Sequence, residues 1–339
     1  MPHPPQPLAS AQQIYASRSR KDGVPADIEE DLRVVGCMLI QEVGILLELP
    51  QSTMATAQVL LHRFFYVSSM LSFSINDTSI AALYLSTKLC ETPIRLKALL
   101  GVYLAVLHRN QHIRKSIAAS SSSSSALRRP PLSTGGMDEW TEGFVYQPPP
   151  AHASVWWEIK EAICVAEMQI LKRLGFNMQV DLAYSHMVNY CKILDLVTIP
   201  GVVQHCWGIL NDALQTPVYT HHPPPTIACF SILLASRLRR IPLPDNWWIL
   251  FDADYEDMMA CCGYLMWLWK RWGDPSSAPM SATEVSAGEG EGKETDAEES
   301  EESRLARWSV MWKMASSRHY VRSFVIDQSL EGDYGWVSV

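Results

Sequence analysis

The chain has 339 residues, 47% of them hydrophobic and 12 of them tryptophan, so it is long enough for two ordinary domains with sizeable cores. It contains no run of about 18 apolar residues, which excludes an ordinary membrane-spanning helix. The formal net charge is −8, but residues 281–303 alone contain nine acids and one lysine. The rest of the chain is nearly neutral and lacks the basic surface that nucleic-acid binding requires.

Cysteine usage and the N-terminus predict a compartment. The eight cysteines are scattered singly apart from Cys261 and Cys262, which is typical of a reducing environment. The N-terminus has no basic region followed by an apolar stretch, so we expect no secretory signal. These features predict a cytosolic or nuclear protein that does not associate with a membrane.

Helical periodicity dominates the first half of the chain, and no convincing alternation of period two predicts a strand. Residues 1–25 are rich in proline, glutamine and serine, and we expect them to be unstructured. The same composition marks an insertion at 116–153, which includes the serine run from Ser120 to Ser125. Helices are predicted at 28–49, 51–69, 76–89, 93–113 and 155–176, the last ending at Gly175.

A second set of helices follows and resembles the first. Its predicted ranges are 181–196, 200–216, 223–239, a short 244–251, and 254–272. The third helix of each set, "SIAALYLSTK" and "TIACFSILLASRLRR", is nearly all apolar and ends in basic residues. A helix that is apolar on all sides is surrounded by other helices. The sequence therefore predicts an all-α protein made of two five-helix bundles, with a disordered insertion and disordered tails.

The predicted domain boundaries follow from these patterns. After the unstructured residues 1–25, the first bundle covers 26–177 and contains the insertion. The second bundle covers 178–272. An acidic disordered linker at 273–303 leads to a C-terminal segment, 304–339, in which residues 303–320 could form a helix.

Motifs for catalysis are weak. "GEGEG" at 288–292 lies in the acidic run without a preceding strand, so it is not a dinucleotide-binding turn. His108 and His112 have a spacing that a metal could use on a helix, but no third ligand accompanies them. We expect no metal, no cofactor and no catalytic residue, and helical bundles without a site motif favour a binding protein.

Lys88 and Glu167 are charges on otherwise apolar helices, and each has two interpretations. Lys88 could simply complement the C-terminus of its helix, and Glu167 could be a solvated residue paired with Lys160 or Lys172. Alternatively, both contact a partner outside the chain. Pattern alone leaves both interpretations open.

Several segments resemble the cyclin family, and in particular its L-type transcriptional members. The resemblance covers roughly 28–115 and 154–272. The segments that carry it are "GILLELPQSTMATAQVLLHRFF", "STKLCETP", "AEMQILKRLGFNMQV", "WGILNDALQT" and "PPTIACFSILLASRLRRIPLP".

The resemblance implies two tandem five-helix cyclin boxes and a regulatory subunit that binds and activates a cyclin-dependent kinase. It implies a nuclear role in RNA polymerase II transcription or pre-mRNA processing. Lys88 and Glu167 match the family pair that contacts the kinase, and they would lie close together across the third and fifth helices of the first box. Leu85, Leu171 and Phe176 match apolar positions that pack beside this pair against the kinase.

This sequence departs from the family pattern at three places. Cys90 precedes Glu91 where two acids are usual, and the substrate-docking helix of cell-cycle cyclins is matched only at Arg33. The tail is acidic rather than rich in arginine and serine. Two alternatives therefore stay open: a cyclin-fold scaffold that activates no kinase, and a nucleic-acid-binding protein of the general transcription factor type. The second would need a basic face and an N-terminal zinc ribbon, and the first 60 residues contain one cysteine, Cys37, and one histidine, His3.

Overall fold

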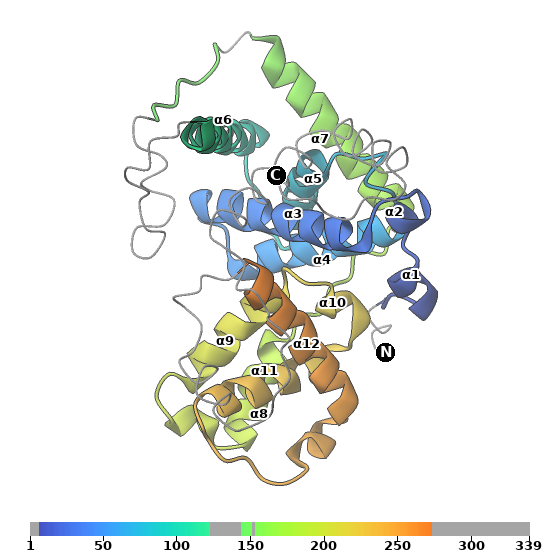
Figure 1. Ribbon diagram of the computed structural model, residues 1–339, viewed down its shortest axis with the longest axis vertical. Coiled ribbons are helices and arrows are strands. Elements are labelled where there is room, and N and C mark those ends of the chain that lie inside the picture. The colour runs from blue at the N-terminus through green and yellow to red at the C-terminus, as the bar shows by residue number, and fades with distance from the viewer. Residues whose placement is uncertain (1–6, 123–143, 151–152, 273–339) are drawn as a thin grey trace. The chain divides into compact units, whose positions relative to one another are not determined.

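The computed structural model describes residues 7–122, 144–150 and 153–272 (Figure 1). Every regular element in these ranges is a helix, so the predicted all-α class is confirmed. The chain divides into two compact units. In the described ranges, the first contains residues up to 107 and 147–182, and the second contains 108–146 and 183–272.

The first unit is built around α5 (Ile75–Leu89), which packs against three helices, α3 (Ala26–Leu46), α4 (Gln51–Val67) and α7 (Ser154–Arg173). The middle of α5 is apolar on every side, and its residues from Ile80 to Leu83 have no exposed surface. This arrangement confirms that the third predicted helix is surrounded by others. Burial of these side chains supplies most of the stability of such a bundle.

The second unit repeats this plan around α11 (Pro224–Leu238). Pro223 and Pro224 begin this helix, because their fixed backbone suits a first helical turn. α11 packs against α8 (Tyr184–Ile193), α9 (Val202–Ala213) and α12 (Tyr255–Trp272). The shorter elements of this unit are η2 (Leu196–Thr198), α10 (Val218–His221) and η3 (Trp247–Phe251).

The N-terminal residues differ from the prediction. Two short helices, α1 (Ala11–Tyr15) and α2 (Arg18–Lys21), lie within the range that we expected to be unstructured. Ser17 and Ser19 at α2 are buried. The polar composition of this segment predicts solvation, but its serines and Arg20 find hydrogen-bond partners inside the fold.

Helix α6 (Leu96–Ser122) also differs in extent. It begins three residues after the predicted Pro93 and continues into the serine-rich insertion. Within the second unit, the rings of His108 and His112 lie 5.6 Å from those of Tyr146 and Phe144, respectively. The ends of the insertion are thus partly ordered by aromatic contacts. The rest of the insertion, the acidic linker and the possible helix at 303–320 lie outside the described residues.

Candidate functional site

Lys88 and Glu167 meet across two helices of the first unit, although they are 79 residues apart in sequence. Lys88 is in the last turn of α5, and Glu167 is in the middle of α7. The Lys88 ammonium donates to Glu167 Oε1 at 2.5 Å and lies 4.0 Å from the ring centroid of Tyr84. The predicted proximity of this pair is therefore confirmed.

The exposure of the two charges is unequal. The Lys88 side chain is 46% exposed, whereas that of Glu167 is 14% exposed. Of the described lysines, neither Lys160 nor Lys172 forms an ion pair with Glu167, so the intrahelical alternative is wrong. Because an ammonium has three N–H groups, Lys88 can bond Glu167 and still donate to an acceptor outside the chain.

The three predicted apolar neighbours lie in different environments. Leu85 is only 4% exposed and belongs to the interior, because α5 is surrounded at that level. Leu171 is half-buried, and Phe176 is 67% exposed. Leu171 and Phe176 can therefore contact a partner, whereas Leu85 packs in the core beneath the site.

Phe176 has an unusual backbone conformation. Helix α7 closes with Gly175 at φ 60° and Phe176 at φ 59°, and the Phe176 N–H donates to the Leu171 carbonyl at 2.9 Å. Glycine tolerates a left-handed φ, but a bulky aromatic residue there costs on the order of 1–3 kcal/mol. An exposed ring held in a strained conformation is the kind of feature that a functional surface retains.

The structure adds apolar positions that sequence reasoning missed. Met168 on α7 is 48% exposed, and Leu89 beside Lys88 is 41% exposed. The sequence contains a signal for these positions, because α7 has apolar residues outside its core-facing stripe. Only the stripe containing Ile163, Ala166 and Ile170 is buried. We define the α5–α7 surface by the residues Lys88, Leu89, Glu167, Met168, Leu171 and Phe176.

A second charged network lies inside the first unit. Glu29 is 1% exposed, accepts from the Ser17 hydroxyl at 2.6 Å, and pairs with Arg20 and Arg33 at 2.9 and 2.7 Å. Burial alone would raise the pKa of the Glu29 carboxyl, but Arg33, the Ser17 hydroxyl and Arg20 together lower it. This network attaches α2 to α3 and accounts for the order of the N-terminal helices.

Arg33 belongs to that network and not to a docking groove. It is 3% exposed, donates to the His62 carbonyl at 3.0 Å, and lies 4.5 Å from the ring centroid of Tyr66. The match of Arg33 to the substrate-docking helix of cell-cycle cyclins is therefore a match of a buried structural residue.

Three further observations concern metal binding, membrane association and Cys90. Among the described side chains, no group of three or more histidines, cysteines or acids could hold a metal ion. In the same part of the chain, no helix is both long enough and apolar enough to cross a bilayer. Cys90, which replaces an acid of the family pattern, lies 3.6 Å from the Thr56 hydroxyl.

Comparison with known proteins agrees with this architecture. Residues 8–116 match the family model described as "Cyclin, N-terminal domain". A chain in the crystal structure of the yeast RNA Pol II CTD kinase CTDK-1 complex shares the fold, with a TM-score of 0.54 at 15% identity over 85% of each chain. These matches support a cyclin, and the two helical units fit tandem cyclin boxes.

Within that family the similarity is to the L-type cyclins. Human Cyclin-L2 is 35% identical over 256 residues, which are 75% of this chain and 43% of that protein. Mouse Cyclin-L2 is 34% identical over 255 residues, again 75% of this chain and 43% of its relative. Cyclin-L1-1 of Oryza sativa is 32% identical over 260 residues, 76% of this chain and 53% of that protein. The chain thus matches about half or less of the length of these relatives.

Proposed function

We propose that the chain is a regulatory subunit that binds and activates a cyclin-dependent protein kinase as a heterodimer, and that it contributes no catalytic group itself. The observation that carries the proposal is the Lys88–Glu167 pair, set among exposed apolar side chains on the α5–α7 surface. The pair matches, residue by residue, the lysine and glutamate with which cyclins contact their kinase.

In the isolated chain, the α5–α7 surface leaves apolar area uncovered and Lys88 with N–H groups that can still donate. Met168 and Phe176 expose large apolar areas, and covering them with a partner is favourable by about 25 cal/mol per Å². Glu167 fixes the position of the Lys88 ammonium before binding, which reduces the entropy lost on association. A partner that supplies backbone carbonyls at a helix end would complete the hydrogen bonds of Lys88.

The proposed setting is nuclear, in RNA polymerase II transcription or pre-mRNA processing. Its support is the similarity to L-type cyclins over both helical units. The acidic composition of 281–303 differs from the arginine- and serine-rich tail of animal L-type members, so transcription is the better supported of the two roles.

A pull-down from nuclear extract tests the proposal. Tagged wild-type chain, a Lys88→Ala/Glu167→Ala variant, and a Lys192→Ala control are compared by quantitative mass spectrometry. Lys192 is an exposed lysine on α8, in the other unit. We expect one cyclin-dependent kinase in near-equal amount with wild type and control, and its loss with the double variant.

The other outcomes separate the alternatives. A kinase retained by the double variant would keep the function and reject the α5–α7 surface as its site. A kinase recovered without peptide-phosphorylating activity would support the scaffold. Recovery of nucleic acid and no kinase would favour the general transcription factor type.

A further inference from the structure

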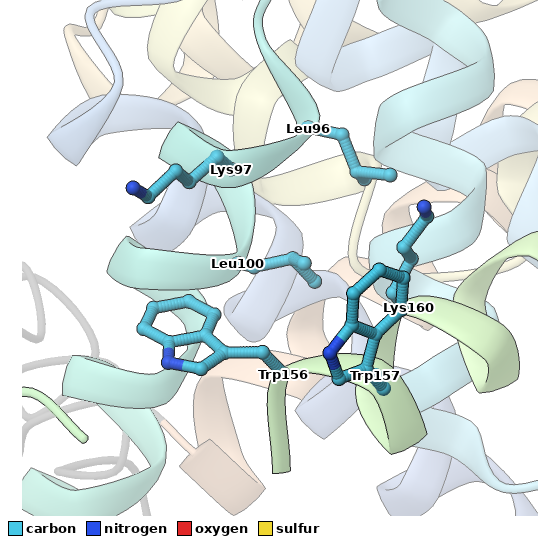
Figure 2. Close-up of a pocket in the computed structure, with 6 residues that line it drawn as sticks. All are labelled: Leu96, Lys97, Leu100, Trp156, Trp157 and Lys160. Atoms are coloured by element: carbon cyan, nitrogen blue, oxygen red, sulfur yellow. The ribbon is translucent and has the colours of Figure 1, made fainter. Parts of the chain in front are cut away.

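A groove with an unusual lining separates the starts of α6 and α7 within the first unit (Figure 2). It has a volume of about 300 Å³. We call it the α6–α7 groove, and its lining residues are Leu96, Lys97, Leu100, Trp156, Trp157 and Lys160. The lining combines apolar surface and two indole rings with two ammonium groups, and it includes no acidic residue.

The aromatic and basic groups of the groove are available to a ligand. Trp157 is 65% exposed, and the Lys160 ammonium lies 5.0 Å from the centroid of its ring. Lys97 and Lys160 are exposed and form no ion pair with the described residues. The Trp156 indole N–H donates to the Pro150 carbonyl at 3.1 Å, which holds that ring in place. Such a surface favours an extended, acidic segment with small or apolar residues between its carboxylates.

The chain itself contains a segment of this composition. Residues 281–303 carry nine acids and one lysine, and the acids are separated mainly by glycine, alanine, serine and threonine. Glu298 follows the last described residue, Trp272, by 26 residues, which can extend over about 90 Å. A segment on a flexible tether that spans the distance to its site acts at an effective concentration in the millimolar range, so weak contacts such as two exposed ion pairs and apolar packing favour its binding.

We propose that the α6–α7 groove binds the acidic segment 281–303 of the same chain, with Lys97 and Lys160 pairing its carboxylates and Trp157 covering its backbone. This contact is independent of the kinase interface. The groove and the α5–α7 surface share helix α7, because Trp157 of the groove and Met168 of the surface lie on one face of α7 at helical spacing. A segment in the groove would therefore lie beside the α5–α7 surface.

Amine footprinting of the full chain tests the proposal without a kinase. Wild type is compared with a variant in which the nine acids of 281–303 are changed to Asn or Gln. Both are treated briefly with an acetylating reagent, and acetylation is quantified by mass spectrometry at Lys97, Lys160 and the control Lys192. We expect Lys97 and Lys160 to react about threefold faster or more in the neutralised variant, because an exposed ion pair protects an amine by about this factor. The reaction rate of Lys192 should not change.

A second variant tests the contribution of the Trp157 ring. Trp157→Ala leaves all carboxylates in place and removes a largely exposed side chain, so the fold is retained; it should abolish the protection of Lys97 and Lys160. Equal reactivity of the groove lysines in wild type and neutralised variant would overturn the proposal. Equal protection of Lys192 would also overturn it, because the effect would then be diffuse. Protection that disappears on dilution would show binding between copies and reject the intramolecular contact.

Discussion

At the scale of single residues, the carboxylate of Glu29 joins three segments of the first unit. It binds Ser17 before α2, Arg20 within α2 and Arg33 on α3. Removing one member of a buried ion pair leaves the other charge uncompensated, which costs about 3–5 kcal/mol. We therefore expect Glu29→Gln to lower the free energy of unfolding at pH 7 by about 3 kcal/mol or more, measured by urea denaturation. Glu256→Gln, at an exposed position of α12, is the control.

The same network predicts a pH dependence. The pKa of Glu29 is lowered in the folded state from its ordinary value of 4.5. Its stabilising contribution is therefore present above that value and is lost as the pH falls through the lower, folded-state pKa. The stability difference between wild type and Glu29→Gln should shrink as the pH is reduced below 4.5. A constant difference down to pH 3 would contradict the ionised network.

Gly36 is a second residue whose environment makes a sharp prediction. A Cβ built on it would lie 2.8 Å from the Ser79 hydroxyl oxygen and 2.9 Å from a Leu61 methyl carbon. Overpacking a core typically costs about 1–3 kcal/mol, so Gly36→Ala should lower the free energy of unfolding by that amount. Gly101→Ala on α6 is the matched control, since a Cβ there meets nothing within 4 Å. It should raise stability by up to about 1 kcal/mol, and similar effects of the two substitutions would contradict the close approach.

At the scale of elements, the end of α7 combines strain with exposure. Phe176→Gly removes a bulky side chain from a left-handed φ of 59° and should raise the free energy of unfolding by about 1 kcal/mol. The same substitution removes an exposed ring of the α5–α7 surface and should weaken kinase binding. Gly175→Ala, at φ 60°, should instead destabilise by about 1 kcal/mol. If Phe176→Gly left kinase affinity unchanged, that ring would not belong to the interface.

Helices are the elements that sequence patterns predict best, and the reasons are visible in particular residues. α5 and α11 are apolar on all sides, which predicts both helix and central position. α2 was missed because "SRSRK" contains no apolar periodicity; its order depends on Glu29, which lies outside that segment. α6 was predicted too short because serine composition predicts a loop, although aromatic contacts of its histidines order the region.

The candidate site was only partly predictable. Glu167 and Lys88 are 79 residues apart, and no local pattern pairs them; only the resemblance to cyclins brought them together. Met168 was missed because an apolar residue on a helix predicts burial. Leu85 and Leu171 are both leucines on amphipathic or apolar helices, and only packing in three dimensions distinguishes the buried one from the half-buried one.

At the scale of the whole molecule, the chain has two helical units, and the first carries both proposed contact surfaces. The α5–α7 surface has an apolar area organised around one ion pair, which suits a stable partner. The α6–α7 groove is smaller and basic, which suits an acidic segment held by a tether. These differences predict unequal responses to salt: raising the ionic strength should release the acidic segment readily and weaken kinase binding much less.

In the proposed complex, Lys88 faces the kinase. The most direct test is the dissociation constant of the purified complex with the kinase recovered from extract, for wild type, Lys88→Ala and Lys192→Ala. Truncating one partner of a hydrogen-bonded charge pair at an interface typically costs about 2–5 kcal/mol, so Lys88→Ala should weaken binding by about 30-fold or more. Lys192→Ala should bind as wild type does. An unchanged dissociation constant for Lys88→Ala would show that Lys88 acts only within the chain, at the C-terminus of α5 and as the partner of Glu167.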